Sequence, residues 1–418
     1  MSEIFEVLVI GAGPSGMIAA ITAGDRGLKT VVLEKKSRPG IKLSITGKGR
    51  CNLTNSADIN EFVKSFRNGK FLYASFKTFF NDELISFFEN LGVPCKLERG
   101  GRYFPQSDKA QDIVDALSKR LKKISKIITG VSVKSVLKRK DGLFEVHSDG
   151  GSFVSKNVII ACGGLSYPST GSTGDGYKIS ESFGHTVKEL SAALVPIVLE
   201  NPYLKELNGL KLKNVEVSVL SPQKISAKEF GEAEFTIFGA DGPAVLTLSS
   251  LVGEEIKKTD LFLSINFKPA LSAQQLNLRL LREIDKFGQY PVKDMLKELL
   301  PVQAVKPFIN YCGINITKKC SQISRIEREK IAASLFDFRF KIKGVKDIKE
   351  AIVTRGGVCT DEIEQKTMQS KLVKGLYFCG EIIDIDAPTG GFNLQAAFST
   401  GYLAGKSVKT ELKVKSEK

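Results

Sequence analysis

The sequence predicts an α/β protein whose main domain has three layers, with a β-rich domain and a small helical domain inserted into it. Three observations lead to this fold class. The first is a glycine-rich turn between a buried strand and a helix near the N-terminus, and the second is a similar turn near the C-terminus. The third is a change of composition near Leu190, where alternating strand-like segments begin.

The N-terminal turn follows an aliphatic segment at Val7–Ile10, which is typical of a strand buried on both faces. Gly11, Gly13 and Gly16 then form the pattern G-x-G-x-x-G, and alanines at helical spacing predict that a helix begins at these glycines. In this pattern the first glycine permits a tight turn, the second lets a pyrophosphate approach the backbone, and the third lets helix and strand pack closely. The positive end of the helix dipole then faces the phosphates.

A second strand-like segment, Thr30–Leu33, ends at Glu34. A carboxylate at this place accepts hydrogen bonds from an adenosine ribose and disfavours a ribose that carries a 2′-phosphate. The two strands, the turn and the acid together predict a dinucleotide site, with Pro14 and Ser15 at the start of its helix. The pattern by itself leaves open whether the dinucleotide is NAD or FAD.

The segment Lys36–Asn55 is rich in glycine, hydroxyl and cationic groups, which predicts a polar loop. Such a loop offers N–H groups and side-chain donors to an extended anionic ligand, and FAD is a ligand of this kind. Disulfide reductases of the flavin class place two cysteines soon after the second strand, whereas here Cys51 has no partner before Cys95. We therefore expect no thiol relay and assign Cys51 to packing or to flavin contact.

The C-terminal part of the chain repeats the pattern of strand, glycine turn and helix. Gly375–Glu381 has the character of a strand that ends in Gly-Glu, and Thr389–Ala397 that of a glycine turn leading into a helix. Such a helix start can stabilise negative charge on a reduced flavin or bind its ribityl chain and pyrophosphate. Val158–Gly164 and Ser169–Gly176 add two glycine-rich segments, in which Asp175 can cap a helix or bind a hydroxyl group. Together these segments favour FAD over NAD as the tightly bound cofactor.

The pattern of strands and helices predicts three domains. An FAD-binding domain comprises residues 1–190 and 345–418, and a β-rich domain comprises residues 191–268 and 336–344. Amphipathic helical patterns predict a helical insertion domain of residues 269–335. Within the first domain, phenylalanines at helical spacing in residues 61–90 predict two amphipathic helices.

Composition limits the class of protein. No apolar run approaches the roughly 18–20 residues that cross a bilayer, so we expect no membrane association. The first strand begins directly after Met1-Ser2-Glu3, which leaves no room for a signal peptide and predicts a cytoplasmic location. With only His147 and His185, we expect no metal site. The formal net charge of +15 leaves a nucleic-acid partner open, but the lysines are spread along the chain and are not interleaved with aromatic residues, so solvated surface is favoured.

Several motifs together resemble one known family. They are the Gly11–Gly16 turn, the signature Thr46–Asn55, and the segments Gly101–Pro105, Ala351–Val358 with Asp361–Ile363, and Gly375–Ala397. Over its full length the chain resembles the BaiN-like bacterial NAD(P)/FAD-dependent oxidoreductases, which have a three-domain FAD fold like that of glutathione reductase and fumarate reductase. Of these motifs, Thr46–Asn55 is far more specific than the dinucleotide pattern.

The resemblance implies positions along the cofactor. Glu34 and Lys35 would meet the adenosine ribose, the backbone of Ser132 and Val133 the adenine, and the remaining segments the ribityl chain and flavin. The candidate cofactor-binding residues are Gly11, Gly13, Pro14, Ser15, Gly16, Glu34, Lys35, Lys42, Thr46, Gly47, Gly49, Arg50, Cys51, Asn52, Ser132, Val133, Cys162, Gly163, Gly164, Thr173, Asp175, Gly380, Glu381, Gly390, Gly391, Phe392, Asn393 and Leu394.

Two positions depart from the family pattern. Lys48 stands where the family usually has glycine or asparagine. Ile237 stands where the family usually has a histidine, so this chain lacks at that place a side chain that can transfer a proton.

We expect an FAD-dependent oxidoreductase that passes electrons from NAD(P)H through flavin N5 to an unidentified small organic acceptor. Arg50, Cys51 and Arg102 are the candidates for residues near the reacting face, and no general acid or base stands out. One alternative is a flavin-dependent enzyme that modifies tRNA or another RNA, which the positive charge motivates. The other is a non-enzymatic flavoprotein that senses redox state or carries electrons. The sequence leaves the oligomeric state open.

Overall fold

The computed structural model describes residues 3–222 and 224–409, which form two compact units. The first unit joins the two ends of the chain, up to Ser191 and from Ile348 onward, and the second unit comprises Ala192–Asp347. No helix in the described part of the chain has both the length and the apolar composition needed to cross a bilayer.

The first unit is organised around a nine-stranded sheet. Its central strands are parallel, because β1 (Ile4–Ile10) pairs with both β2 (Thr30–Glu34) and β9 (Gly151–Ile160), with Ile10 opposite Leu33 on one side and Ile160 on the other. Val7, Leu8 and Val9 are fully buried, as the aliphatic composition predicts. The remaining strands of this sheet are β6 (Lys126–Thr129), β7 (Val133–Lys138), β8 (Phe144–Ser148), β18 (Ile363–Glu364), β19 (Gln369–Ser370) and β20 (Leu376–Phe378).

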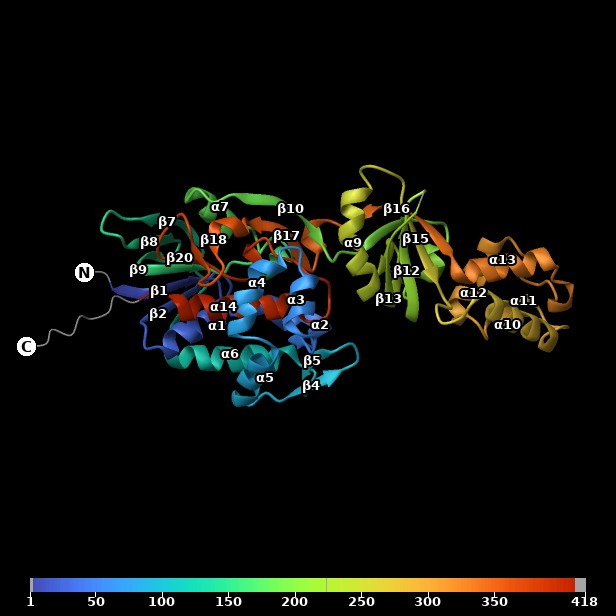
Figure 1. The fold of residues 1–418 in the computed structure, drawn as a ribbon, viewed down its shortest axis with the longest axis horizontal. Coiled ribbons are helices and arrows are strands. Elements are labelled where there is room, and N and C mark those ends of the chain that lie inside the picture. Colours follow the sequence, from blue (N-terminus) through green and yellow to red (C-terminus); the bar gives the residue numbers. More distant parts are fainter. Residues whose placement is uncertain (1–2, 223, 410–418) are drawn as a thin grey trace, which may run out of the picture. The chain divides into compact units, whose positions relative to one another are not determined.

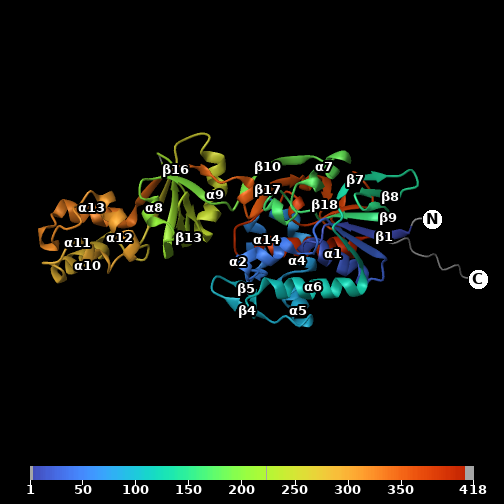
Figure 2. The same cartoon turned by 180° about the vertical axis from the view of Figure 1, so that it is seen from behind.

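Helices cover one side of the parallel strands and β-structure covers the other (Figures 1 and 2). On the helical side α1 (Pro14–Asp25) lies beside α14 (Phe392–Ser407) and α6 (Ala110–Ile124), although the first two come from opposite ends of the chain. On the other side lie β7, β8 and α7 (Asp175–Ser182). This arrangement confirms the three-layer α/β fold class. The unit also has a two-stranded sheet and a three-stranded sheet, formed by β10 (Val187–Ala193) with β17 (Val353–Val358) and by β3 (Thr54–Asn55), β5 (Arg102–Pro105) and β4 (Cys95–Glu98).

Two local predictions in this unit were wrong. The phenylalanine-rich segment forms three helices instead of two, because the chain extends at Phe66 and breaks a single helix: α3 (Ile59–Ser65), α4 (Gly69–Thr78) and α5 (Asn81–Asn90). The segment expected to be a polar loop contains α2 (Ile41–Gly49), which begins after Gly40 in a left-handed conformation and buries Leu43.

The second unit is built on a closed six-stranded barrel. In barrel order its strands are β11 (Ile197–Glu200), β14 (Gly239–Asp241), β13 (Ile225–Thr236), β12 (Lys211–Leu220), β15 (Phe262–Asn266) and β16 (Phe338–Val345). The short helix α8 (Leu204–Leu207) follows β11, and α9 (Pro243–Glu255) follows β14. This barrel confirms the additional β-rich part of the predicted fold.

Helices lie between β15 and β16 in sequence. They are α10 (Ala273–Lys286), α11 (Val292–Leu296), α12 (Val302–Cys312) and α13 (Arg325–Phe336). Helix α12 contains Pro307, although proline normally ends a helical pattern. That these helices form a domain of their own stays a prediction.

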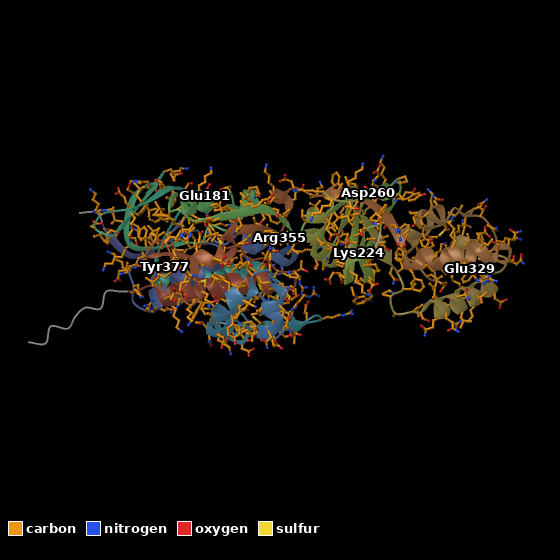
Figure 3. All side chains as sticks on the ribbon, turned by 45° about the horizontal axis from the view of Figure 1, so that its top comes forward. Glu181, Lys224, Asp260, Glu329, Arg355 and Tyr377 are labelled. Atoms are coloured by element: carbon orange, nitrogen blue, oxygen red, sulfur yellow. The ribbon has the colours of Figure 1, made fainter. Side chains whose placement is uncertain are left out.

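Polar and apolar side chains separate as expected for a folded protein (Figure 3). Tyr377 is only 1% exposed within the first unit, whereas Glu181 on α7 is exposed. In the second unit the Glu329 side chain on α13 is 55% exposed and pairs with Arg325.

Candidate functional site

The three glycines of the N-terminal turn occupy three different environments. Gly11 has φ of +103°, and a Cβ there would lie 2.6 Å from the carbonyl oxygen of Ala161 on the end of β9. A Cβ on Gly16 would lie 2.0 Å from the carbonyl oxygen of Gly11, so helix and turn are in direct contact. A Cβ on Gly13 would meet nothing within 4 Å, so the space in front of this backbone is open. Gly11 and Gly16 therefore serve folding, whereas Gly13 leaves room for a ligand.

The start of α1 is suited to an anion. Gly13 is its N-cap residue, no side chain caps it, and its first turn contains no acidic residue. The unpaired N–H groups and the positive end of the dipole therefore face the space beside Gly13.

Glu34 closes this turn from the end of β2. Its two carboxylate oxygens accept hydrogen bonds from the N–H groups of Ala12 and Lys36, each at 2.8 Å, and the residue is only 9% exposed. The carboxylate thus holds the glycine turn against β2, and its remaining lone pairs are free to accept ribose hydroxyl groups.

Lys35 connects the second strand to the glycine-rich segment before α7. Its ammonium group pairs with Asp175 at 2.7 Å and donates a hydrogen bond to Thr173. Partial burial would raise the pKa of Asp175, but the hydrogen bonds from Lys35 and Thr173 outweigh burial and lower the pKa. Asp175 lies in the first turn of α7 without capping it, since the N-cap residue is Gly174. The structure therefore joins the end of β2, at Glu34 and Lys35, to the distant segment that contains Thr173 and Asp175.

Ser132 and Val133 lie beside the same group. The N–H of Val131 donates to the carbonyl oxygen of Glu34 at 3.0 Å, and the N–H of Ser132 donates to the carboxylate of Asp149 at 2.8 Å. The backbone expected to meet adenine, at Ser132 and Val133, therefore comes directly after a residue that is hydrogen-bonded to Glu34.

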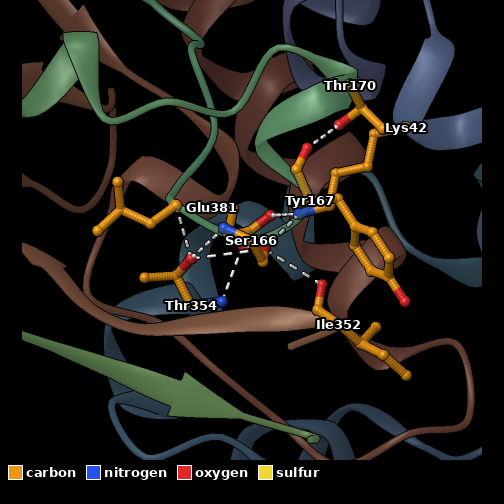
Figure 4. A network of polar contacts seen from close by, with 8 residues as sticks. Lys42, Ser166, Tyr167, Thr170, Ile352, Thr354 and Glu381 are labelled. Atoms are coloured by element: carbon orange, nitrogen blue, oxygen red, sulfur yellow. Dashed lines mark hydrogen bonds and ion pairs between the residues drawn. The ribbon is translucent and has the colours of Figure 1, made fainter. Parts of the chain in front are cut away.

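A second cluster forms around Glu381, which follows β20 (Figure 4). Lys42 on α2 pairs with its carboxylate at 2.6 Å, the hydroxyl of Ser166 donates to it at 2.7 Å, and the N–H of Thr354 donates at 2.8 Å. Burial would raise the pKa of Glu381, but the charge of Lys42 and these hydrogen bonds lower it overall. The Glu381 carboxylate thus links α2, β17 and the segment after β9 through one ion pair and two hydrogen bonds. A Cβ on the neighbouring Gly164 would lie 2.3 Å from the hydroxyl of Thr354.

The two ends of the chain also meet at the glycines after β20. A Cβ on Gly380 would lie 2.4 Å from the hydroxyl oxygen of Ser15, and the N–H of Gly380 donates to the hydroxyl of Thr400 on α14 at 3.0 Å. Cys162, next to Gly163, lies 3.5 Å from the carbonyl oxygen of Ile10 through its thiol. The N-terminal glycine turn (Gly11–Gly16), the end of β9 and the end of β20 therefore share one edge of the sheet.

Asparagine side chains hold the signature loop against the start of α14. Asn55 donates to the carbonyl oxygens of Gly100 and Gly390, each at 3.0 Å. Asn52, with its amide oriented to satisfy both ends, accepts from the N–H of Gly391 at 3.0 Å and donates to Tyr103 and Thr54. Asn393 closes the loop before α14 by bonding to the N–H and carbonyl of Ala387 at 3.0 and 2.8 Å. The sequence assigned Asn52 and Asn393 to the cofactor, whereas here their amides contact the chain itself.

The signature loop has an unusual backbone. Thr46 interrupts α2 with extended dihedral angles, and the Thr46 hydroxyl donates to the carbonyl oxygen of Leu43. Gly47, Lys48, Gly49 and Cys51 then have φ of +58°, +58°, +84° and +61°. Positive φ favours glycine and asparagine, which gives a conformational reason for the family preference at the position of Lys48.

The two candidate arginines of the reacting face bond to other groups of the chain, Arg50 to side chains and Arg102 to the backbone. Arg50 pairs with Glu98 and Asp108, each at 2.5 Å, and its guanidinium lies 4.1 Å from the ring centroid of Phe104. Arg102 donates to the carbonyl oxygen of Arg99 at 3.0 Å. Both arginines thus lie beside the three-stranded sheet, and their role stays a prediction.

Three cysteines lie within the site. Burial raises the pKa of each thiol to about 12, so none is a thiolate at neutral pH. These cysteines are Cys51, Cys162 and Cys379.

Two buried acids were missed by the sequence reading. Asp386 pairs with Arg355 at 3.0 Å, and Asp384 accepts a hydrogen bond from the Asn68 amide at 3.1 Å. Burial raises the pKa of Asp384, although the positive charge of Arg67 acts against it. The alternation of acid and isoleucine before Pro388 was the only signal available, and it does not tell buried acids from exposed ones.

Comparison with known proteins identifies the chain. A family described as HI0933-like protein Rossmann domain matches residues 5–407. A 3-dehydro-bile acid delta(4,6)-reductase of Clostridium scindens is 31% identical over 96% of this chain and 98% of its own. A ribosomal RNA dihydrouridine synthase of Escherichia coli is 31% identical over 97% of this chain and 98% of its own. In fold, the chain is similar to a 3-ketosteroid delta1-dehydrogenase of Sterolibacterium denitrificans, with a TM-score of 0.55 at 12% identity over 97% of this chain and 99% of that one.

The fold, the site and these similarities define an FAD-dependent oxidoreductase. The open space at Gly13 and the glycine-lined edge of the sheet fit an extended dinucleotide. The chain belongs to the HI0933-like family, and its similarity to the bile-acid reductase confirms the resemblance seen in the sequence.

Proposed function

We propose that this oxidoreductase reduces a carbon–carbon double bond conjugated to a carbonyl group, with NAD(P)H as electron donor. When bound, FAD accepts hydride from the nicotinamide and donates it from N5 to the acceptor. What carries the proposal is that two relatives, each similar over the whole chain, share this chemistry although their substrates differ. A bile-acid delta(4,6)-reductase and a dihydrouridine synthase both add two hydrogens across such a double bond.

The thiols of the site support direct transfer to an organic acceptor. A flavin-dependent disulfide reductase needs a reactive thiolate pair, whereas Cys51 is fully buried and its pKa is raised to about 12. Cys162 and Cys379 have equally raised pKa values. The acceptor therefore receives electrons without a thiol relay.

We further propose how the chain holds FAD. The start of α1 binds the pyrophosphate, Glu34 and Lys35 bind the adenosine ribose, and the Ser132–Val133 backbone binds the adenine. The signature loop and the glycines before α14 bind the ribityl chain and flavin. Helix α14 has no acidic residue in its first turn, so its positive end stabilises negative charge on the flavin.

The test uses purified, FAD-loaded protein under anaerobic conditions. We expect NADH or NADPH to bleach the visible flavin absorbance, and a conjugated enone to restore it while the saturated ketone forms. Absence of bleaching with both nucleotides contradicts the donor. Reoxidation only by oxygen, together with a partner protein that binds one redox state, favours an electron carrier instead.

The second candidate is the synthesis of dihydrouridine in ribosomal RNA. The similarity to the Escherichia coli enzyme and the net charge of +15 favour it. We expect the reduced protein to convert uridine to dihydrouridine in ribosomal RNA taken from a strain that lacks its own synthase, measured by nucleoside mass spectrometry. Unchanged RNA together with active enone reduction removes this candidate and leaves the first.

A further inference from the structure

A shallow pocket of about 290 Å³ lies on the first unit, and its lining includes none of the residues described above. Residues of α3 and α4, which contact each other, form one wall, and residues of the turn between β18 and β19 form the other. Its lining residues are Val63, Lys70, Tyr73, Ala74, Gln365 and Lys366. The lining combines an apolar floor with an aromatic ring and two cations, and it contains no carboxylate.

One face of α4 alternates cations with the aromatic ring. Lys70, Tyr73 and Lys77 are spaced at three and four residues, which places them on the same side of the helix. Tyr73 is 45% exposed, and the ammonium group of Lys77 lies 5.6 Å from its ring centroid. Lys70, Lys77 and Lys366 are all exposed. The sequence reading found no interleaving of lysines with aromatic residues, but helical spacing and the distant Lys366 produce it here.

The two walls are joined to each other and to the edge of the sheet. The hydroxyl of Ser75 on α4 lies 3.9 Å from the sulfur of Met368, which follows the turn. The N–H of Phe378, at the end of β20, donates to the carbonyl oxygen of Met368 at 3.0 Å. The pocket thus lies at the carboxyl end of β20, and ligands of open α/β sheets bind along this edge.

We propose that this pocket binds single-stranded RNA, with an unpaired base stacked on Tyr73 and the flanking phosphates on Lys70, Lys77 and Lys366. Exposed aromatic rings set among lysines bind single strands in this way, because every base offers a flat face and the backbone carries one charge per phosphate. The inference rests on the RNA candidate of the proposed function and names the surface that would hold that RNA. The lining contains two lysines, Lys70 and Lys366, and no carboxylate, so its charge complements that of a phosphate chain.

The test measures binding of a fluorescently labelled oligouridine to the FAD-loaded protein by anisotropy at several salt concentrations. One variant is Tyr73→Ala, and a second combines Lys70→Gln, Lys77→Gln and Lys366→Gln. The control combines Lys119→Gln, Lys122→Gln and Lys123→Gln, which removes the same charge from exposed positions on α6. All of these side chains lie at the surface, so retained FAD absorbance shows that each variant is folded.

We expect Tyr73→Ala to weaken binding about fivefold or more without changing its salt dependence, since a lost stacking contact is not electrostatic. The pocket triple variant lowers the slope of log K against log salt by about 2, from about 0.7 for each lost phosphate contact. The control leaves affinity and slope close to those of the unchanged protein.

Three outcomes overturn the inference. Equal losses from the pocket and control triple variants show that general charge binds the RNA, and an unchanged affinity for Tyr73→Ala removes the stacking contact. If Tyr73→Ala instead raises the NADPH concentration needed to bleach the flavin, the pocket belongs to the nicotinamide nucleotide. Flavin bleaching and enone reduction are measured on the same samples, so a failure of the proposed function is seen separately.

Discussion

The contact between α1 and α14 is the sharpest test of how the site is assembled. Two glycines of α14, one turn apart, lie directly on the backbone of α1. A Cβ on Gly401 would lie 2.3 Å from the carbonyl oxygen of Ser15, and a Cβ on Gly405 would lie 2.3 Å from that of Ala19. The guanidinium of Arg26 also donates to the carbonyl oxygen of Gly405 at 2.9 Å. At these two glycines the backbone of α14 therefore lies directly against α1, beside the side chains of Ile18 and Thr22.

The substitution Gly401→Ala forces these helices apart. A methyl carbon needs about 3.3 Å from a carbonyl oxygen, so the backbones must separate by about 1 Å. Such overpacking costs about 1–3 kcal/mol, against which alanine returns up to about 1 kcal/mol of helix propensity. With the full gain in helix propensity, the net loss is at most about 2 kcal/mol, which lowers the melting temperature of a unit of this size by up to about 8 °C. The shift also moves the start of α14 away from the N-terminal glycine turn, so FAD binding weakens.

The assay follows flavin fluorescence during heating, because the chain contains no tryptophan to report unfolding and released flavin is bright. The matched control is Gly253→Ala in α9, where a Cβ would meet only a methyl group of Val345 at 3.8 Å. We expect the control to keep or raise its melting temperature, by the helix propensity of alanine. A melting temperature and FAD content of Gly401→Ala equal to those of the unchanged protein would refute this account of the helix contact.

Three further predictions concern the site itself. Glu381→Gln leaves Lys42 with its hydrogen bond to Ser166 but without a charged partner, and it lowers the free energy of unfolding by roughly 1–3 kcal/mol at neutral pH. Because the folded pKa of Glu381 is lowered, the stability that its charge supplies is lost as pH falls below 4.5. Thermal melts of the variant should therefore lose less stability on acidification than those of the unchanged protein. Lys48→Gly should raise the free energy of unfolding by about 1 kcal/mol, because glycine tolerates the positive φ at this position, and a lower value in denaturant titrations would contradict the strain. Three cysteines of the site have raised thiol pKa values: Cys51, Cys162 and Cys379. We therefore expect Ellman's reagent to react with these thiols only after denaturation, and fast labelling of them in the folded protein would contradict this.

The sequence predicts those parts of the molecule in which neighbours along the chain decide the structure. The strand at Val7–Ile10, the glycine turn and the acid at Glu34 lie within a short segment, and each has a composition that allows few alternatives. The start of α14 is visible for the same reason, since Gly390 and Gly391 both have positive φ. The fold class follows from these elements.

Contacts between distant segments could not be predicted in this way. The tie between Lys42 and Glu381 and the bond from Asn55 to Gly390 each join segments far apart in sequence. No periodicity marks such pairs, because each partner alone is an ordinary polar or glycine residue of its own segment. For the same reason the bonds of the Asn393 amide to the backbone of Ala387 could not be predicted, while its contact with the cofactor stays a prediction.

Because both ends of the chain contribute to the site, FAD binding and the closure of α1 against α14 form one equilibrium. A ligand that binds only the closed state stabilises it by RT ln(1 + [L]/Kd), so added FAD offsets a weakened helix contact. We expect excess FAD to raise the melting temperature of Gly401→Ala by less than that of Gly253→Ala, because weaker FAD binding gives a larger Kd and therefore a smaller stabilisation at the same FAD concentration. Equal shifts for both variants would mean that the α1–α14 contact stabilises the fold without positioning the cofactor.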